Sequence, residues 1–138
     1  MTILDTNVLS ALMQAAPDQQ VVAWLDRQPR TSIWITSITI LEVRFGLEIM
    51  AAGKKRSALI QAFEALLEKI GQRVAPFDAA AARQAADLMA LRQKKGRPGD
   101  LRDTMIAGIV LATRAALATR NIAHFEDVSA AVIDPWNA

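Results

Sequence analysis

Apolar positions along the chain follow two different spacings, and the alternation between them predicts an α/β fold. Short β-branched or aliphatic runs bounded by polar residues are typical of strands, and they fall at residues 2–4, 32–36, 74–77, 116–119 and 131–133. Apolar residues three and four positions apart are typical of helices packed on one face. That spacing predicts helices at about residues 6–13, 17–30, 37–52, 55–70, 78–93 and 101–115.

The order of these elements indicates how they pack. Strands that alternate with helices favour a mostly parallel sheet of four or five strands covered by helices. We expect residues 1–138 to form a single domain, because the chain is long enough for a hydrophobic core and has no internal repeat. Polar residues at the helix starts predict Thr6, Ser37 and Asp78 as N-caps.

The first predicted strand leads directly into Asp5, where the chain turns into a helix. Open α/β sheets bind ligands outside the carboxyl ends of their strands, so a functional carboxylate would be well placed at this position. A carboxylate here can also simply form the turn. This segment alone leaves both interpretations open.

Two further acids fall on helix faces that are otherwise apolar. Glu42 lies within a stripe formed by Ile38, Leu41, Phe45 and Ile49, and an acid at position 103 heads the stripe of the last helix. An isolated ionised carboxylate in an apolar setting is very unfavourable unless it is paired or binds a metal. Neither acid has a Lys or Arg three or four residues away, which is the spacing of helix ion pairs.

Other acids do have such neighbours, and we expect ordinary surface ion pairs for them. They are Glu48 with Arg44, Asp87 with Arg83 and Asp26 with Arg30. For Glu42 and Asp103 two interpretations remain. Either they reach a distant arginine or extend past the edge of the core, or they converge with Asp5 at the carboxyl edge of the sheet.

Convergence of three carboxylates predicts a metal site. Like charges gathered in one place raise one another's pKa, and a divalent cation removes that conflict. The chain has no Cys and one His, so its oxygen ligands suit Mg²⁺ or Mn²⁺ rather than zinc. Such ions activate water for attack on a phosphodiester. This chemistry needs no side-chain nucleophile, and no G-x-S-x-G or P-loop pattern is evident.

Composition and charge narrow the setting. The longest run of apolar or small residues, 105–112, is too short to span a bilayer, and no signal-peptide pattern opens the chain. We therefore expect a cytoplasmic protein that does not enter membranes. A formal net charge of +2 permits a polyanionic partner. Two basic clusters are either RNA contacts or solvated loop ends: Lys54, Lys55 and Arg56, and Lys94, Lys95 and Arg97.

Several short motifs, in this order, resemble the PIN domain. They are Leu4–Asn7 at the start, Glu42 early in the third predicted helix, Asp103–Ala107, Ala118–Asn121 followed by His124 and Phe125, and a closing Asp134–Trp136. The order and spacing are similar to those of the VapC-like ribonuclease toxins of bacterial toxin–antitoxin pairs, over essentially the whole chain. Each motif alone is weak, and their succession is specific.

The resemblance implies a fold and an activity. It implies a small three-layer α/β/α sandwich that cleaves RNA with acidic residues and Mg²⁺ or Mn²⁺, dimerises, and is blocked by a cognate antitoxin. By position, Asp5, Glu42 and Asp103 would be the metal ligands. Thr6 and Asn7 would support Asp5, and the threonine at position 119 would lie at the rim of the site.

The sequence departs from the family pattern at one place. Family members often carry a fourth acid at one of two positions that are Asn121 and His124 in this chain. Asn121 can coordinate through its carbonyl but adds no charge, and His124 is either a ligand or a structural residue. Asp100 would either supply the missing charge or cap its helix. One firmly held ion is therefore expected.

Two other functions remain open. A catalytically silent RNA- or protein-binding module would keep the acids without using them. A haloacid-dehalogenase-like phosphatase would use Asp5 as a nucleophile, but such enzymes need a second Asp where Asn7 stands. A second apolar row on the third predicted helix, at Ile40, Val43, Leu47 and Met50, is either a self-association face or part of the core. The RNA that would be cut is not indicated by the sequence.

Overall fold

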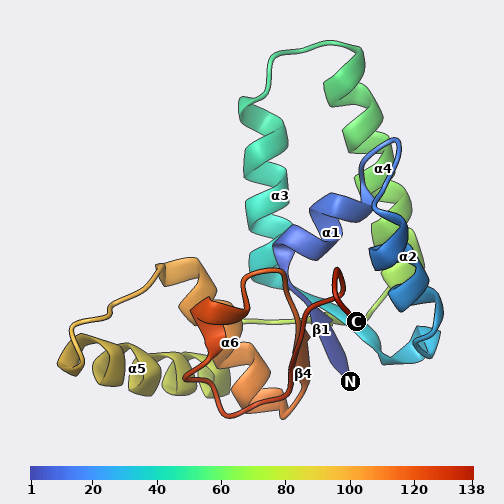
Figure 1. Cartoon of the computed structure of the whole chain (residues 1–138). Helices are drawn as coiled ribbons and strands as arrows, with labels where there is room; N and C mark the ends of the chain where they lie inside the picture. Colours follow the sequence, from blue (N-terminus) through green and yellow to red (C-terminus); the bar gives the residue numbers. More distant parts are fainter.

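The computed structural model describes all 138 residues and contains a five-stranded sheet and six α-helices (Figure 1). The strands are β1 (Thr2–Leu4), β2 (Ile33–Thr36), β3 (Val74–Ala75), β4 (Ala116–Ala118) and β5 (Val132–Ile133). The helices are α1 (Thr6–Leu12), α2 (Gln19–Asp26), α3 (Ser37–Ile49), α4 (Lys54–Ile70), α5 (Ala79–Lys94) and α6 (Leu101–Thr113). Two 3₁₀ helices that the sequence analysis did not predict, η1 (Arg30–Ser32) and η2 (Ile122–Phe125), complete the chain.

All neighbouring strands are parallel, in the order β3-β2-β1-β4-β5. Successive side chains of the central strand β1 point to opposite faces. Ile3 packs in a cluster with residues of α5 and α6, and Leu4 packs in a second cluster with residues of α1 to α4. Helices thus cover both faces, and the predicted α/β/α sandwich with a small parallel sheet is confirmed.

Two of the three predicted helix caps are displaced by one residue. The side chain of Asp5, not Thr6, caps α1, and the side chain of Thr36, not Ser37, caps α3. In each case the capping side chain belongs to the last residue of a strand or to the residue directly after it. Asp78 caps α5 as predicted. The correction matters for Asp5, because a cap carboxylate lies at the positive end of its helix dipole.

Of the two apolar rows on α3, the row that contains Glu42 is buried only at Ile38. Leu41, Phe45 and Ile49 are 53%, 55% and 69% exposed, whereas Val43 and Leu47 of the second apolar row are buried in the cluster that contains α4 residues. Both rows of this helix are apolar, so composition could not choose between them. The second half of α3 leaves the sheet and pairs with α4 in a hairpin (Figure 1), and that pairing selects the buried row.

Close packing of α5 against α6 helps to fix the position of Asp103, the third of the candidate acids. A Cβ atom added at Gly108 of α6 would lie 2.5 Å from the carbonyl oxygen of Ala81 and 2.8 Å from the Cβ of Ala85, both on α5. Only glycine allows this approach without a shift of the backbone. The two helices therefore hold the start of α6, and Asp103 with it, at a fixed place beside the sheet.

Of the three predicted surface ion pairs, one forms. Arg44 and Glu48 lie 3.7 Å apart. Asp26 ends α2, and Arg30 lies beyond Pro29 in η1, so helical i,i+4 geometry is lost. Arg83 and Asp87 are exposed on α5 and form no ion pair, consistent with the small net gain from such contacts in water. No helix has both the length and the apolar character needed to cross a membrane.

Candidate functional site

The carboxyl ends of β1 and β4 bring Asp5 beside Thr119. The strands pair with Leu4 opposite Ala118, and the Asp5 backbone N–H donates to the Ala118 carbonyl at 2.8 Å. The Asp5 carboxylate is 3% exposed. Its Oδ1 accepts from the Thr6 backbone N–H at 2.8 Å, and its Oδ2 accepts from the Thr119 hydroxyl at 2.7 Å. Asp5 is therefore a fixed, buried carboxylate.

Burial raises the pKa of Asp5 from its ordinary value of 3.8 to about 6. The hydrogen bonds from Thr119 and Thr6 oppose this rise, and the negative charges of Asp103 and Glu42 add to it. Because both charges affect the pKa of Asp5, the carboxylates of Asp5, Glu42 and Asp103 lie near one another at the carboxyl edge of the sheet. Near neutral pH this edge holds a buried negative charge with two more beside it, which favours a cation.

Threonine hydroxyls orient Glu42. The Thr6 hydroxyl donates to Glu42 Oε1 at 2.8 Å and lies 2.9 Å from the Thr39 hydroxyl. Because the single hydroxyl hydrogen of Thr6 goes to Glu42, Thr39 must be the donor to Thr6. Thr36 in turn donates to Thr39 at 3.4 Å. A chain of three threonines thus ends on the carboxylate.

Glu42 also meets a distant arginine. Arg102 Nε lies 3.7 Å from Glu42 Oε2, so the first of the two interpretations left open by the sequence is correct in part for this residue. The Arg102 side chain is exposed, and 3.7 Å is long for a charged hydrogen bond. Arg102 is adjacent to Asp103 in sequence, and no arginine pairs with Asp5 or Asp103.

Asp103 lies in the first turn of α6 and faces η2. Its Oδ2 is 3.1 Å from Nδ1 of His124, whose side chain is 56% exposed. Asp100 caps α6, since its Oδ1 accepts from the Asp103 backbone N–H at 3.1 Å. Of the two roles considered for Asp100, the structure supports the cap.

The positions of Asp5, Glu42 and Asp103 can be tested for their fit to a divalent metal ion. As the side chains lie, no group of three or more His, Asp or Glu residues is arranged to hold one. The donor chemistry nevertheless fits a hard divalent cation, because the charges that act on Asp5 are those of two further carboxylates. Glu42 and Asp103 are each partly accessible, and the one ionisable partner of each, Arg102 or His124, has an exposed side chain.

Comparisons with known proteins agree with this geometry. The PIN domain family matches residues 2–131. The chain belongs to the PIN-domain family. VapC ribonuclease Y4jK of Sinorhizobium fredii is 40% identical over 99% of this chain and 98% of its own length. Toxin FitB of Neisseria gonorrhoeae is 31% identical over 99% of each chain. The crystal structure of FitAcB from the same organism superposes with a TM-score of 0.90 at 31% identity over the full length of both.

This PIN domain is thus similar to ribonuclease toxins from end to end, and the predicted membership among VapC-like toxins is confirmed. The phosphatase alternative is set aside, because haloacid-dehalogenase-like enzymes are a different family.

Some of the predicted supporting residues contact Asp5, and others contact none of the three acids. Thr119 is buried and bonds Asp5, so its predicted place at the rim is wrong. Asn7 lies 3.4 Å from Asp5 Oδ2 and accepts from the Arg120 backbone N–H at 3.2 Å. The Asn121 side chain is exposed and makes no hydrogen bond, although its backbone N–H donates to Thr119. Asn121 therefore does not replace the fourth acid in this arrangement.

The two basic clusters lie in different places. Lys95 and Arg97 line a cavity of about 260 Å³ that also contains Asp103 and His124. Residues 54–56 begin α4 at the far end of the α3–α4 hairpin (Figure 1). There Arg56 donates to the Leu47 carbonyl at 2.7 Å and stabilises the hairpin. Only the 94–97 cluster adjoins one of the three acids, Asp103.

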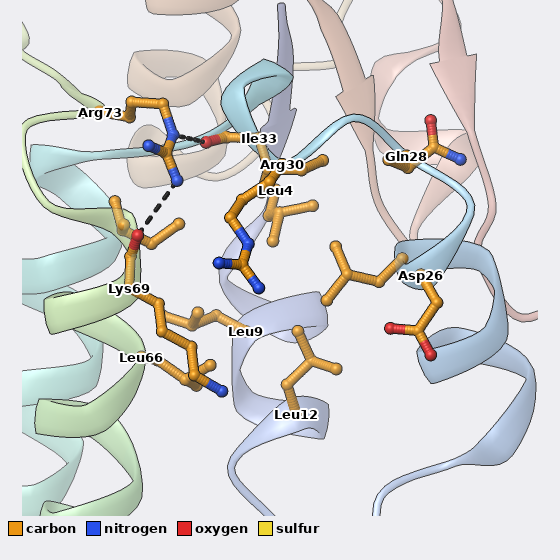
Figure 2. Close-up of a pocket in the computed structure, with 12 residues that line it drawn as sticks. Leu4, Leu9, Leu12, Asp26, Gln28, Arg30, Ile33, Leu66, Lys69 and Arg73 are labelled. Atoms are coloured by element: carbon orange, nitrogen blue, oxygen red, sulfur yellow. Dashed lines mark hydrogen bonds between the residues drawn. The ribbon is translucent and has the colours of Figure 1, made fainter.

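A separate cavity of about 380 Å³ lies among α1, α2 and α4 (Figure 2). Several of its lining residues are leucines, and Figure 2 shows the side chains of Arg30 and Lys69 extending toward Leu9 and Leu66. Arg73 at its edge donates to the carbonyls of Ile33 and Lys69. The cavity contains none of the three acids, so it is not part of the candidate active site.

Sequence reasoning missed one residue beside the site. Arg92 of α5 is 4% exposed and reaches α6 and η2. A signal existed, because the buried residues of α5 are Ala81, Ala85, Leu88 and Arg92, at spacings of four, three and four. An arginine on the buried stripe of a helix requires partners within the fold.

Proposed function

We propose that this PIN domain is a metal-dependent endoribonuclease and the toxin of a toxin–antitoxin pair. The observation that carries the proposal is the buried Asp5 carboxylate, whose pKa is raised to about 6 beside Glu42 and Asp103. Relatives named as a VapC ribonuclease and as tRNA(fMet)-specific endonucleases support the choice of RNA. Strongly perturbed pKa values cluster at functional sites, so the raised pKa of Asp5 favours a functional role for this carboxylate.

Asp5, Glu42 and Asp103 would hold Mg²⁺ or Mn²⁺. When bound, such an ion lowers the pKa of water and neutralises charge that develops on a phosphodiester. A cation among the three acids would compete with Arg102 for Glu42, which the length of the present 3.7 Å contact allows.

The remaining residues orient the acids and the substrate. Thr119 and the Thr6 backbone fix both oxygens of Asp5, and the Thr6 hydroxyl fixes Glu42. His124 holds Asp103 through Nδ1. Lys95 and Arg97, in the same cavity as Asp103, would contact phosphates of single-stranded RNA.

The partners follow from the relatives. Solved structures of FitAB and of VapBC assemblies support a cognate antitoxin as the partner. In our proposal this antitoxin would cover the acids of the chain. A second copy of the chain would cover the exposed row of Leu41, Phe45 and Ile49, since exposed apolar patches mark association sites. We also propose a cytoplasmic location, where a ribonuclease under antitoxin control would meet its RNA.

Cleavage of total RNA tests the proposal. Wild type with Mg²⁺ should cut, whereas wild type with chelator and Asp5→Asn with Mg²⁺ should be slower by roughly 1,000-fold, corresponding to several kcal/mol. Asp87→Asn removes an exposed acid from α5 and serves as the matched control, with activity like wild type. Equal cleavage in all four samples would reject the proposal.

A silent binding module remains the second candidate, because Asn121 stands where a fourth acid is common and contacts none of the acids. Thermal unfolding with and without Mg²⁺ separates the two functions. A metal site predicts a melting temperature that rises with Mg²⁺ concentration in wild type and not in Asp5→Asn. No rise in wild type, together with no cleavage, would favour the silent module.

A further inference from the structure

Arg92 is the most buried cation of the chain, and the mechanism above does not use it. Its side chain leaves α5 between α6 and η2 and is 4% exposed. A buried guanidinium is tolerated only where its donors are satisfied. Every group that satisfies Arg92 belongs to the surroundings of Asp103 and His124.

Four hydrogen bonds hold the guanidinium. Nε and Nη2 donate to the two oxygens of Asp127 at 2.9 and 2.8 Å, which is the bidentate arrangement that arginine alone provides. Nη2 also donates to the His124 backbone carbonyl at 2.9 Å. Nη1 donates to the Thr104 hydroxyl at 2.9 Å. One planar group thus joins α5, the first turn of α6 and η2.

The chain around Arg92 is shaped to this group. Gly99, in the loop between α5 and α6, has φ +68, and a Cβ atom there would lie 3.2 Å from Nη1. The Thr104 hydroxyl that accepts from Nη1 also donates to the Asp100 carbonyl at 2.8 Å. The hydrogen bond from Arg92 holds the pKa of Asp127 below its ordinary value, so the pair stays ionised at neutral pH.

Arg92 therefore supports both partners of the contact between His124 and Asp103 in the candidate active site. His124 lies in the short 3₁₀ helix η2, which is not part of the sheet. Its backbone carbonyl accepts a hydrogen bond from Arg92 Nη2. Asp103 precedes Thr104, which is held by Nη1. These two attachments, together with the close packing of α5 against α6 at Gly108, hold His124 Nδ1 and Asp103 Oδ2 at 3.1 Å.

We infer that Arg92 is a positioning residue for the RNA-cleaving site, which it serves by fixing His124 against Asp103. This inference rests on the proposed function. It assigns to Arg92 and Asp127 a task that reaches beyond joining α5 to η2. Positioning groups around catalytic side chains typically contribute 10- to 100-fold to activity.

The experiment uses Arg92→Lys, which keeps the positive charge and loses the bidentate fork. Arg83→Lys is the matched control, because Arg83 is exposed on the same helix. His124 is the one histidine of the chain, so its imidazole ¹H–¹³C signal is unambiguous. In metal-free protein at one pH, we expect the signal of Arg92→Lys to move toward that of Asp103→Asn, and that of Arg83→Lys to coincide with wild type.

Kinetics in Mg²⁺ then connect the contact to cleavage. We expect kcat of Arg92→Lys to fall by roughly 10- to 100-fold with little change in KM, and to change much less when both proteins carry His124→Ala. A loss of the same size in the His124→Ala background would show that Arg92 acts only on the fold, and an unchanged kcat would show no part in cleavage. Either result overturns the inference.

The imidazole signal decides the matter independently of catalysis. If wild type fails to cut RNA, the proposed function fails, whereas an imidazole signal unchanged by Arg92→Lys overturns the inference alone. If Arg92→Lys does not fold, as judged by circular dichroism, Asp127→Asn takes its place. That variant loses the charge pair and retains the Thr104 contact, and the same outcomes apply.

Discussion

The acids of this PIN domain are held in two contrasting ways. In the sheet-edge region, made of Asp5, Thr6, Thr119 and Glu42, backbone pairing and threonine hydroxyls fix the carboxylates. In the α6–η2 region, made of Asp103, His124, Arg92 and Asp127, a buried charge network fixes a segment outside the sheet. In the first region Asp5 is held by neutral donors alone, whereas in the second Arg92 and Asp127 form an ion pair.

The contrast has an energetic meaning. Neutral hydrogen bonds only partly compensate for the burial of Asp5, so its ionised form is unfavourable in the fold and its pKa rises. A full ion pair compensates Asp127, so its pKa falls. The sheet-edge region stores an unfavourable charge that a cation can relieve. In the α6–η2 region the Arg92–Asp127 pair is already neutralised, and this pair serves as support for Asp103 and His124.

Substitution of one acid in each region should separate activity from stability. We expect Asp5→Asn and Asp103→Asn each to reduce RNA cleavage by roughly 1,000-fold. In chelator at pH 7, Asp5→Asn should also raise the free energy of unfolding, because asparagine can cap α1 without the buried charge. Asp103→Asn should not, since Asp103 is partly exposed. Urea unfolding measures the difference, and destabilisation by Asp5→Asn would contradict it.

The dependence of stability on pH should have opposite signs in the two regions. The pKa of Asp5 is about 6 in the fold and 3.8 as its ordinary value, so its contribution is present below pH 3.8 and is lost as pH rises through 6. At 1.36 kcal/mol for each pKa unit this amounts to roughly 3 kcal/mol by pH 7. The pKa of Asp127 is lowered, so its contribution is present above pH 3.8 and is lost as pH falls through the folded value.

Unfolding by urea between pH 3 and pH 8 in chelator checks both slopes. Asp5→Asn should remove the fall in stability between pH 4 and pH 7, and Asp127→Asn should weaken the fall below pH 4. The variants thereby act as controls for each other. A wild-type profile parallel to that of Asp5→Asn across pH 4–7 would contradict the assignment to Asp5.

The sequence predicted the sheet-edge region better than the α6–η2 region, and the reason is local order. The apolar run before Asp5 ends the strand, and the helical spacing begins at once, so the place of Asp5 at the sheet edge follows from residues 2–13 alone. The position of Asp103 follows similarly from its helix. What these acids contact depends on residues far away in the chain, such as Arg102, which is 60 positions after Glu42.

Predictions failed where the local pattern allowed two answers. Helix α3 is apolar on two rows, and only its pairing with α4 decides that Val43 is buried and Phe45 is exposed. The Arg92–Asp127 pair joins residues 35 positions apart across an irregular segment. No periodicity marks Asp127, whereas Arg92 could be found from its place on the buried stripe of α5.

Removal of one hydroxyl in the sheet-edge region tests how much orientation of Glu42 contributes. Thr6→Val keeps the backbone N–H that bonds Asp5 and deletes the donor to Glu42 Oε1. We expect a loss of roughly tenfold in kcat with a small change in melting temperature. Thr113→Val, which deletes a hydroxyl that bonds only its own helix, is the matched control. Equal activity of the two variants would mean that the threonine chain does not orient the acid.

The smallest expected effect concerns RNA affinity and separates the two basic clusters. Lys95 and Arg97 adjoin Asp103, whereas Lys54 and Lys55 lie at the far end of the α3–α4 hairpin. Each lost contact with a single-stranded phosphate lowers the slope of log affinity against log salt by about 0.7. These slopes are measured in Asp5→Asn protein, which we expect to bind RNA and to cut it very slowly. In that background Lys95→Ala with Arg97→Ala should lower the slope by roughly 1.4, and Lys54→Ala with Lys55→Ala should leave it unchanged. Fluorescence anisotropy with a labelled oligonucleotide measures both slopes. Equal decreases would mean that RNA follows the net charge of the protein rather than the α6–η2 region.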